Sequence, residues 1–467
     1  MVVGDITTGT EVLVVGGGPA GYTAAIRAAQ HDLDVTLVER ADYGGTCLNH
    51  GCIPSKALVS ATDLAHRAGS ADELGIEADP SVDLERMVAW KDGVVDQLTG
   101  GVEKLCKGNG VTLLEGTATF AEPGVVRVAG DGDGEGAETH AYDHAVIATG
   151  SRPVELDGFS FADDPVLDSR AALSLTEIPD RLAIVGAGYI GMELAGVFAK
   201  LGSEVTVLEA LGQVLPGYEQ DLARPVRKRA TSLGVTIELE TAASGWEETD
   251  DGIRVTHDGE AVAADAVLVA VGREPVTDEL GLEAIDLGTD ESGAIPTDEV
   301  GRTDRESVFA VGDVAGEPML AHAGMAEGEL ASATIAGETP AVPQVVPAVV
   351  FTDPEVATAG FTASEAEDAG YDPVVGEFPF RASGRALTAD ETDGFVRVVA
   401  DESGYLLGAE VVGPEASELV AELTLALELG ATLEDVATTV HAHPTLAEAT
   451  MEAAENALGQ AIHTLNR

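Results

Sequence analysis

The stretch Val12-Leu13-Val14-Val15-Gly16-Gly17-Gly18-Pro19-Ala20-Gly21 joins a short apolar run to a cluster of glycines. The apolar run predicts a buried strand, the small residues after it predict a helix, and a second apolar run predicts a strand that ends at Glu39. Glycines at this spacing let a pyrophosphate approach the helix N-terminus, and the acid can accept hydrogen bonds from a ribose. We therefore expect a dinucleotide site built on Gly16, Gly18, Gly21 and Glu39.

The same pattern occurs a second time in the middle of the chain. An apolar run at 182–185 leads into Gly186-Ala187-Gly188-Tyr189-Ile190-Gly191, and the next apolar run ends at Glu209. The spacing from first glycine to acid is the same 23 positions in both copies. Matched spacing predicts two dinucleotide sites, with a duplicated fold that binds only one ligand as the alternative. Glu209 would repel a 2′-phosphate and no arginine occurs in 210–215, so the second site is predicted to take NAD rather than NADP.

Three further apolar runs end in glycine turns. They end at Thr149-Gly150-Ser151, at Gly272 and at Gly312-Asp313. Open α/β sheets meet their ligands at the carboxyl ends of the strands, so we expect these turns to lie beside the dinucleotide sites.

A second informative stretch, Gly44-Gly45-Thr46-Cys47-Leu48-Asn49-His50-Gly51-Cys52-Ile53-Pro54-Ser55-Lys56, contains two of the three cysteines. In a reducing cell interior such a pair indicates redox chemistry rather than scaffolding. Pro54 suits the first turn of a helix, which would place Cys52 near the N-terminus, where the dipole favours a thiolate. Cys52 is therefore expected to be the electron-rich sulfur, and Cys47 the thiol that exchanges with a substrate. A structural disulfide or metal pair is the alternative, but no ligand cluster adjoins the cysteines and no metal is predicted. The third cysteine, Cys106, is expected to be structural.

Acidic residues dominate the composition, with 82 Asp and Glu against 25 Lys and Arg and a formal net charge of −57. A solvated carboxylate surface of this kind is tolerable where salt shortens the Debye length to a few Å, which indicates a halophilic source. Nucleic-acid binding is disfavoured, because phosphates need a basic patch. With 45% apolar residues and no apolar run of ~18, the sequence predicts a folded cytoplasmic protein without a transmembrane helix.

The pattern changes beyond Pro343. Short apolar runs at 394–399 and 406–412 and a helix near 417–430 predict an α+β association domain without a nucleotide signature. The last motif is His441-Ala442-His443-Pro444-Thr445-Leu446-Ala447-Glu448. A histidine can take a thiol proton near neutral pH and a carboxylate can orient the imidazole, so His443 and Glu448 are the predicted base.

Together these motifs resemble those of the flavin disulfide reductase family. The resemblance covers nearly the whole chain and keeps the family's order, and its cysteine stretch is most similar to that of the dihydrolipoamide dehydrogenases. It rests on the cysteine stretch, both fingerprints, Thr149-Gly150, Gly312-Asp313, Met319-Leu320-Ala321-His322, Phe351-Thr352-Asp353-Pro354 and the terminal His-Pro-Thr-x-x-Glu.

The resemblance implies FAD and NAD as cofactors and a role for each motif residue. Cys47 would be the interchange thiol and Cys52 the charge-transfer thiol, while Lys56, paired with Glu193, would reach the flavin N5 region. His443 and Glu448 would come from the partner subunit of an obligatory homodimer. The residues implied to hold FAD are Gly16, Gly18, Gly21, Glu39, Lys56, Gly116, Thr149, Gly150, Ser151, Gly312, Asp313, Met319, Leu320, Ala321 and His322. Those implied to hold NAD are Gly186, Gly188, Gly191, Glu209 and Gly272.

The implied fold is α/β, with two Rossmann-like dinucleotide-binding domains and a C-terminal α+β dimerisation domain. We expect the FAD-binding domain over 1–150, with a returning segment over 276–346. The NAD-binding domain is expected over 151–275 and the interface domain over 347–467.

The implied activity is oxidation of protein-bound dihydrolipoamide, with electrons passing through the Cys47–Cys52 disulfide and FAD to NAD⁺. The chain would then be the E3 component of 2-oxoacid dehydrogenase-type complexes, with the lipoyl domain of E2 as partner. One alternative is another pyridine-nucleotide disulfide reductase acting on a low-molecular-weight disulfide, which an aromatic at Tyr189 slightly favours. The alternative of another class is a non-catalytic flavoprotein scaffold or sensor, but none of the predicted reactive residues is missing.

Overall fold

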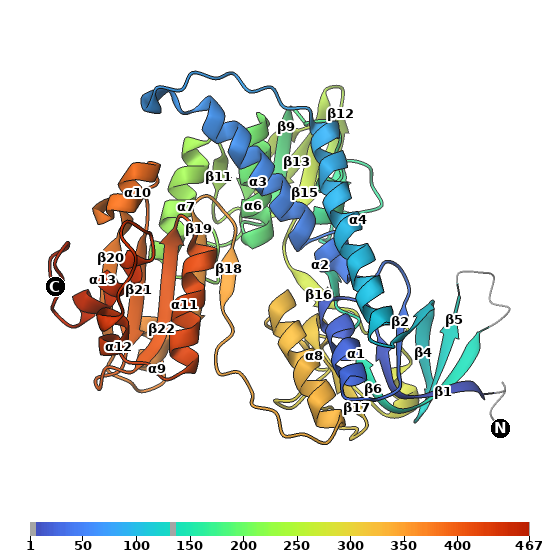
Figure 1. Ribbon diagram of the computed structural model, residues 1–467. Helices are drawn as coiled ribbons and strands as arrows, with labels where there is room; N and C mark the ends of the chain where they lie inside the picture. Colours follow the sequence, from blue (N-terminus) through green and yellow to red (C-terminus); the bar gives the residue numbers. More distant parts are fainter. Residues whose placement is uncertain (1–5, 131–136, 467) are drawn as a thin grey trace.

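The computed structural model describes residues 6–130 and 137–466, which form three larger sheets, each with its own helices (Figure 1). The acid- and glycine-rich segment 131–136 lies outside the described residues. The architecture confirms the predicted α/β class with an added α+β region.

The first sheet has the strand order β3-β2-β1-β6-β5-β4, with β17 also paired to β6. Strands β1, β2, β3, β6 and β17 are parallel, whereas β4 and β5 are antiparallel neighbours. The bounds are β1 Ile6–Val15, β2 Val35–Glu39, β3 Thr112–Glu115, β4 Thr117–Glu122, β5 Val125–Ala129, β6 Glu138–Ile147 and β17 Val308–Ala310. Its helices are α1 Pro19–Gln30, α4 Leu84–Gly108 and α8 Ala321–Ile335, and α1 and α8 lie side by side (Figure 1). The chain thus leaves this sheet after β6 and returns to it at β17.

The second sheet is parallel and is inserted between those two points. Its order is β11-β10-β9-β15-β8, and an antiparallel ladder of β12, β13 and β14 adjoins it. The strands are β8 Val166–Leu167, β9 Arg181–Val185, β10 Glu204–Leu208, β11 Thr236–Glu238, β12 Ala243–Thr249, β13 Gly252–His257, β14 Glu260–Ala264 and β15 Ala266–Val269. The helices are α5 Ser169–Ala172, α6 Tyr189–Leu201 and α7 Gln220–Ser232.

The third sheet is antiparallel, in the order β18-β19-β22-β21-β20, and lies at the far end of the molecule from β4 and β5 (Figure 1). Its strands are β18 Ala348–Val350, β19 Glu355–Gly360, β20 Val374–Pro379, β21 Phe395–Ala400 and β22 Leu406–Gly413. Its helices are α9 Ala363–Asp368, α10 Gly384–Ala389, α11 Ala416–Glu428, α12 Leu433–Thr438 and α13 Glu448–Ala457. This is the predicted α+β region, and its own apolar core lies between sheet and helices.

Short elements connect the sheets and carry the cysteines. Strands β7, Ser151–Pro153, and β16, Arg273–Pro275, pair antiparallel where the chain passes from the first sheet to the second and back. Cys47 lies in α2, Gly45–Asn49, and Cys52 is the first residue of α3, Cys52–Gly69. The remaining helical turns are η1 Asp72–Leu74, η2 Leu282–Ile285, η3 Gly312–Ala315 and η4 Phe380–Ala382.

The third cysteine lies apart from this chemistry. Cys106 is on α4 with no exposed surface, packed in the apolar core beneath the first sheet, and burial raises the pKa of its thiol to about 11. This supports the predicted structural role.

Candidate active site

The two glycine fingerprints have the same local geometry. Gly16 and Gly186 have φ of 106° and 103°, in the left-handed region that favours glycine. Glu39 Oε2 accepts a hydrogen bond from the Gly17 N–H at 2.6 Å, and Glu209 Oε2 accepts one from the Ala187 N–H at the same distance. The other oxygen, Oε1, accepts a hydrogen bond at 2.8 Å from the backbone N–H of the residue two positions after the acid, Ala41 or Leu211. Both acids therefore fix the backbone of the glycine turn.

The first fingerprint forms a cradle that only glycines permit. A Cβ on Gly21 would lie 1.9 Å from the Gly16 carbonyl oxygen, and one on Gly45 would lie 2.6 Å from Gly18 Cα. Two backbone turns thus meet without side chains at the N-terminus of α1, where a phosphate is favourably placed. The adjoining cavity has a volume of about 450 Å³. This donor set and space fit the pyrophosphate and flavin of FAD.

The cavity brings together most of the predicted FAD and redox residues. They come from the first fingerprint, the cysteine stretch, α6, the two turns at 149–151 and 312–313, and the segment that leads into α8. The predicted residues that line it are Gly16, Gly18, Glu39, Cys47, Cys52, Lys56, Thr149, Gly150, Ser151, Glu193, Gly312, Asp313, Met319, Leu320 and Ala321. His50 and Tyr189, which had no predicted role, also line it.

A few predicted residues lie elsewhere. Gly116 lines a smaller hollow on the other side of Glu39. His322 was expected near the flavin, but its exposed ring does not line the cavity and its Nε2 lies 2.6 Å from the Pro347 carbonyl oxygen. It is the second residue of α8, which turns its side chain toward the segment before β18. The residues predicted to hold NAD lie outside the main cavity, where strands of the second sheet end. They are Gly186, Gly188, Gly191, Glu209 and Gly272, and their role in NAD binding remains a prediction.

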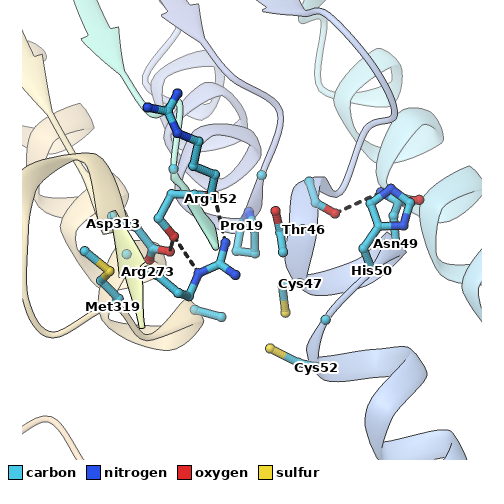
Figure 2. Close-up of a pocket in the computed structure, with 18 of the residues that line it drawn as sticks. Pro19, Thr46, Cys47, Asn49, His50, Cys52, Arg152, Arg273, Asp313 and Met319 are labelled. Atoms are coloured by element: carbon cyan, nitrogen blue, oxygen red, sulfur yellow. Dashed lines mark hydrogen bonds between the residues drawn. The ribbon is translucent and has the colours of Figure 1, made fainter. Parts of the chain in front are cut away.

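The two cysteines face each other across the floor of the cavity (Figure 2). The hydrogen bond from the Cys47 thiol, assisted by the Lys56 ammonium, lowers the pKa of Cys52 to about 7 against the effect of burial. The same hydrogen bond and burial raise the pKa of Cys47. Cys52 is also the first residue of α3, where the helix dipole favours negative charge. The reduced pair therefore carries its thiolate on Cys52, in agreement with the sequence-based expectation.

Lys56 lies one turn beyond Cys52 and is held by a buried carboxylate. Lys56 Nζ contacts Glu193 Oε2 at 2.8 Å, as the resemblance implied, and the Glu193 side chain is only 4% exposed. Glu193 Oε1 accepts the Phe351 N–H at 2.9 Å, and Lys56 Nζ lies 4.5 Å from the centre of the Phe351 ring. Sequence reasoning gave Phe351 no role, although an aromatic in a quoted family motif was a usable signal.

On the opposite wall, the predicted residues Ser151 and Asp313 are joined by Arg273, which the sequence analysis missed. Ser151 Oγ donates a hydrogen bond to Asp313 Oδ2, and Arg273 Nε donates to Ser151 Oγ at 2.8 Å. Figure 2 shows Arg152, Arg273, Asp313 and Met319 together on the wall facing the cysteines. The charged residue directly after the Gly272 turn was the signal that could have identified Arg273.

The two residues of the predicted base, His443 and Glu448, lie in contact with each other but do not line the cavity. His443 Nδ1 lies 2.9 Å from Glu448 Oε1, and Glu448 Oε2 accepts the Thr445 N–H at 2.9 Å. Burial alone would raise the pKa of Glu448, but these hydrogen bonds hold it below its ordinary value. The His443 side chain is 79% exposed, so its free Nε2 is open to another molecule. His441 is different, because its ring is held between Thr439 O and Glu422 Oε1.

The chain has two dinucleotide-binding folds and a cavity that contains a pair of cysteines, one of them a thiolate. These features define an oxidoreductase that moves electrons between thiols and nucleotides. Residues 10–328 match the pyridine nucleotide-disulphide oxidoreductase model, and 346–454 match the dimerisation domain of the same family. The chain belongs to the pyridine nucleotide-disulphide oxidoreductases and, within them, to the dihydrolipoyl dehydrogenases. It is an enzyme whose cofactors are FAD and NAD, and it forms a homodimer through the C-terminal region.

Full-length relatives support this placement. The chain is 63% identical to dihydrolipoyl dehydrogenase from Halobacterium salinarum and 62% identical to that from Haloferax volcanii, with 100% of each chain covered. The enzyme of the same name from Geobacillus stearothermophilus is 48% identical over the same full coverage. The relatives from halophilic archaea confirm the halophilic character that the charge predicted.

Solved structures agree in fold. LpdA from Mycobacterium tuberculosis is 28% identical, with a TM-score of 0.90 over 96% of this chain and 99% of that one. The HOCl-induced flavoprotein disulfide reductase RclA from Escherichia coli is 27% identical, with a TM-score of 0.86 over 95% and 99%. Across residues 6–130 and 137–466, no helix has the length and apolarity needed to cross a bilayer.

Proposed function

We propose that the chain oxidises dihydrolipoyl groups on lipoyl proteins and transfers the electrons through Cys47, Cys52 and FAD to NAD⁺. The observation that carries this is the Cys52 thiolate, paired with Cys47 and flanked by Lys56–Glu193, in the cavity beside the first fingerprint. The name shared by the full-length relatives supports the choice of substrate.

The first half-reaction is a thiol–disulfide exchange in which atoms and electrons balance. One substrate thiolate attacks Cys47 Sγ of the Cys47–Cys52 disulfide, the S–S bond breaks, and Cys52 leaves as a thiolate. The second substrate thiol then attacks the substrate sulfur of the mixed disulfide and its proton passes to Cys47, which leaves as a thiol and releases the oxidised substrate. His443 takes a proton from the substrate dithiol, and Glu448 orients the imidazole and stabilises its cation. Two electrons and two protons thereby pass to the enzyme.

The second half-reaction depends on the charge around Cys52. Lys56 stabilises the thiolate, and Glu193 with Phe351 holds Lys56 in place. A flavin bound in this cavity would supply the acceptor for the two electrons as the Cys47–Cys52 disulfide re-forms, and the hydride for NAD⁺. Gly16, Gly18 and Asp313 would hold its phosphate and ribityl parts, and Gly186, Gly188 and Glu209 would hold NAD.

Cysteine variants test the assignment of the redox pair. Cys47→Ser and Cys52→Ser should each abolish dihydrolipoamide-dependent NAD⁺ reduction but retain bound FAD, because the cradle that fits FAD does not include either sulfur. The control Cys106→Ser removes a buried thiol outside the cavity and should retain turnover. Substantial turnover in either active-site variant would contradict the assignment.

We further propose that the base reaches Cys47 from the partner subunit. The exposed ring of His443 and its position outside the chain's own cavity support this arrangement. Mixing the inactive variants Cys47→Ser and His443→Gln tests it, because a hybrid dimer would contain one site with both an intact Cys47 and an intact partner His443. Random pairing should restore about a quarter of wild-type activity, since half of the dimers are hybrids and half of their sites are complete. If both groups acted within one subunit, no activity would return.

The biological setting follows from the same proposal. A lipoyl domain of a 2-oxoacid dehydrogenase E2, or a similar lipoyl protein, would deliver the substrate, and the chain would act as the E3 component. The cytoplasmic location and the domain limits expected from the sequence remain predictions.

A further inference from the structure

The helix that begins at Cys52 is joined to α6 by two ion pairs rather than one. Lys56 Nζ contacts Glu193 Oε2 at 2.8 Å, and Lys200 Nζ contacts Asp63 Oδ1 at 2.6 Å. Both pairs join residues 137 positions apart, so the second pair lies about two turns further along both helices. The polarity is reversed, with the cation on α3 in the first pair and on α6 in the second. A slip by two turns would place like charges opposite each other, so the two pairs specify one register.

The loop before β19 contacts both ion pairs. Its Phe351 N–H is hydrogen-bonded to Glu193, and its Asp353 Oδ2 lies 2.9 Å from Lys200 Nζ. Asp353 Oδ2 also lies 2.9 Å from Arg229 Nε on α7. Burial alone would raise the pKa of Asp353, but the two cations hold it below its ordinary value. One loop thus joins the ion pair Lys56–Glu193 to a second group two turns away, which we call the outer cluster: Asp63, Lys200, Arg229 and Asp353.

The outer cluster is well shielded from solvent at its centre. The Lys200 side chain is 5% exposed, and those of Asp63 and Asp353 are 37% and 35% exposed. His66, also on α3, completes the cluster with its Nε2 at 3.3 Å from Arg229 Nη2. Burial, Arg229 and Lys200 lower the pKa of His66, so its ring is neutral and can accept that hydrogen bond. Buried pairs are screened by salt much less than surface pairs, which matters in a chain adapted to high salt.

We propose that Lys200 and Asp353 are positioning residues for Cys52, because they set the register of α3 against α6 that holds Lys56 beside the thiolate. They touch neither substrate nor flavin and act through the two helices. This inference rests on the proposed role of Cys52 as the thiolate that faces the flavin.

Two variants of opposite charge separate positioning from simple electrostatics. Lys200→Met removes a cation, and Asp353→Asn removes an anion, so their direct effects on the ionisation of Cys52 have opposite signs. A loss of helix register should raise the pKa of Cys52 in both variants, because Lys56 moves away from the thiolate in either case. The measurement is the pH midpoint of the long-wavelength thiolate–flavin absorbance in reduced holoenzyme at high KCl. Both variants should raise the midpoint by about 0.5 to 1 pH unit.

Controls keep the test decisive. Lys228→Gln disrupts an exposed pair with Asp393 and should leave the midpoint unchanged, and Lys200→Arg should stay near wild type. If Lys200→Met does not fold, Asp63→Asn serves in its place, with the same upward shift expected. Shifts of opposite sign, or unchanged midpoints in folded variants, would overturn the proposal. If the wild-type holoenzyme showed no pH-dependent thiolate–flavin absorbance, the assigned role of Cys52 itself would be refuted. This outcome distinguishes a failure of the proposed function from a failure of the positioning proposal.

Discussion

Replacing Lys56 with methionine removes the ammonium beside Cys52 and keeps most of the side-chain volume. The structure lowers the pKa of Cys52 from 9.0 to about 7. At pH 7 about half of Cys52 is then thiolate, against roughly 1% for a thiol at its ordinary value. The hydrogen bond from Cys47 is the larger cause of the shift and remains in the variant. Lys56→Met is therefore expected to reduce the thiolate fraction at pH 7 by about three- to tenfold.

The assay is a pH titration of the same thiolate–flavin absorbance, together with the rate of dihydrolipoamide-dependent NAD⁺ reduction. Thiolate forms as the pH rises, so the variant's midpoint should lie above that of the wild type and its activity should recover toward alkaline pH. An unchanged midpoint in Lys56→Met would refute the view that the ammonium stabilises this thiolate.

Three other variants test the second nucleotide site and the buried ion pair Arg397–Glu410 of the third sheet. Glu209→Gln weakens the acceptor that holds the Ala187 N–H. If Glu209 binds NAD as proposed, steady-state kinetics should show a roughly tenfold higher KM for NAD⁺ and an unchanged KM for dihydrolipoamide. Arg397→Met leaves the buried Glu410 without its cation and should lower the free energy of unfolding by about 3 kcal/mol or more. Urea denaturation at high KCl measures this, and the matched control Arg254→Met, at an exposed pair, should lose less than about 1 kcal/mol. Burial raises the pKa of Glu410 from 4.5 to about 7, so its contribution to stability is present below pH 4.5 and is lost as the pH rises through 7. Thermal melts at pH 5 to 8 should therefore show a smaller fall for Glu410→Gln than for the wild type, and parallel curves would contradict this origin.

The sequence was most informative where function depends on local backbone geometry. The glycines at 16, 18 and 21 and the cysteines at 47 and 52 act through turns and a helix start, and those follow from short-range spacing. Their cavity and the thiolate on Cys52 match what the spacing predicted. The repeat of the fingerprint also predicted a second sheet of the same kind.

Contacts between distant segments were not predictable from such spacing. The Lys200–Asp63 pair and the hydrogen bond from Arg273 to Ser151 join residues separated by more than a hundred positions, and neither segment alone indicates its partner. Lys56–Glu193 was expected only because a family resemblance supplied it. For His322 the motif predicted a place near the flavin, whereas the structure shows its ring against the Pro347 carbonyl oxygen, so its contact with FAD stays a prediction.

The pairing of β7 with β16 has a consequence for how such a chain could arise. The segment carrying the second fingerprint departs and returns through two adjacent strands, with Arg273 opposite Pro153 and the Val276 N–H bonded to the Gly150 carbonyl. Its two ends therefore meet in one two-stranded ladder between the first and second sheets, and a copied gene fragment inserted there leaves the pairing of β6 with β17 undisturbed. A dinucleotide fold can in this way be nested inside its own duplicate by a single genetic event.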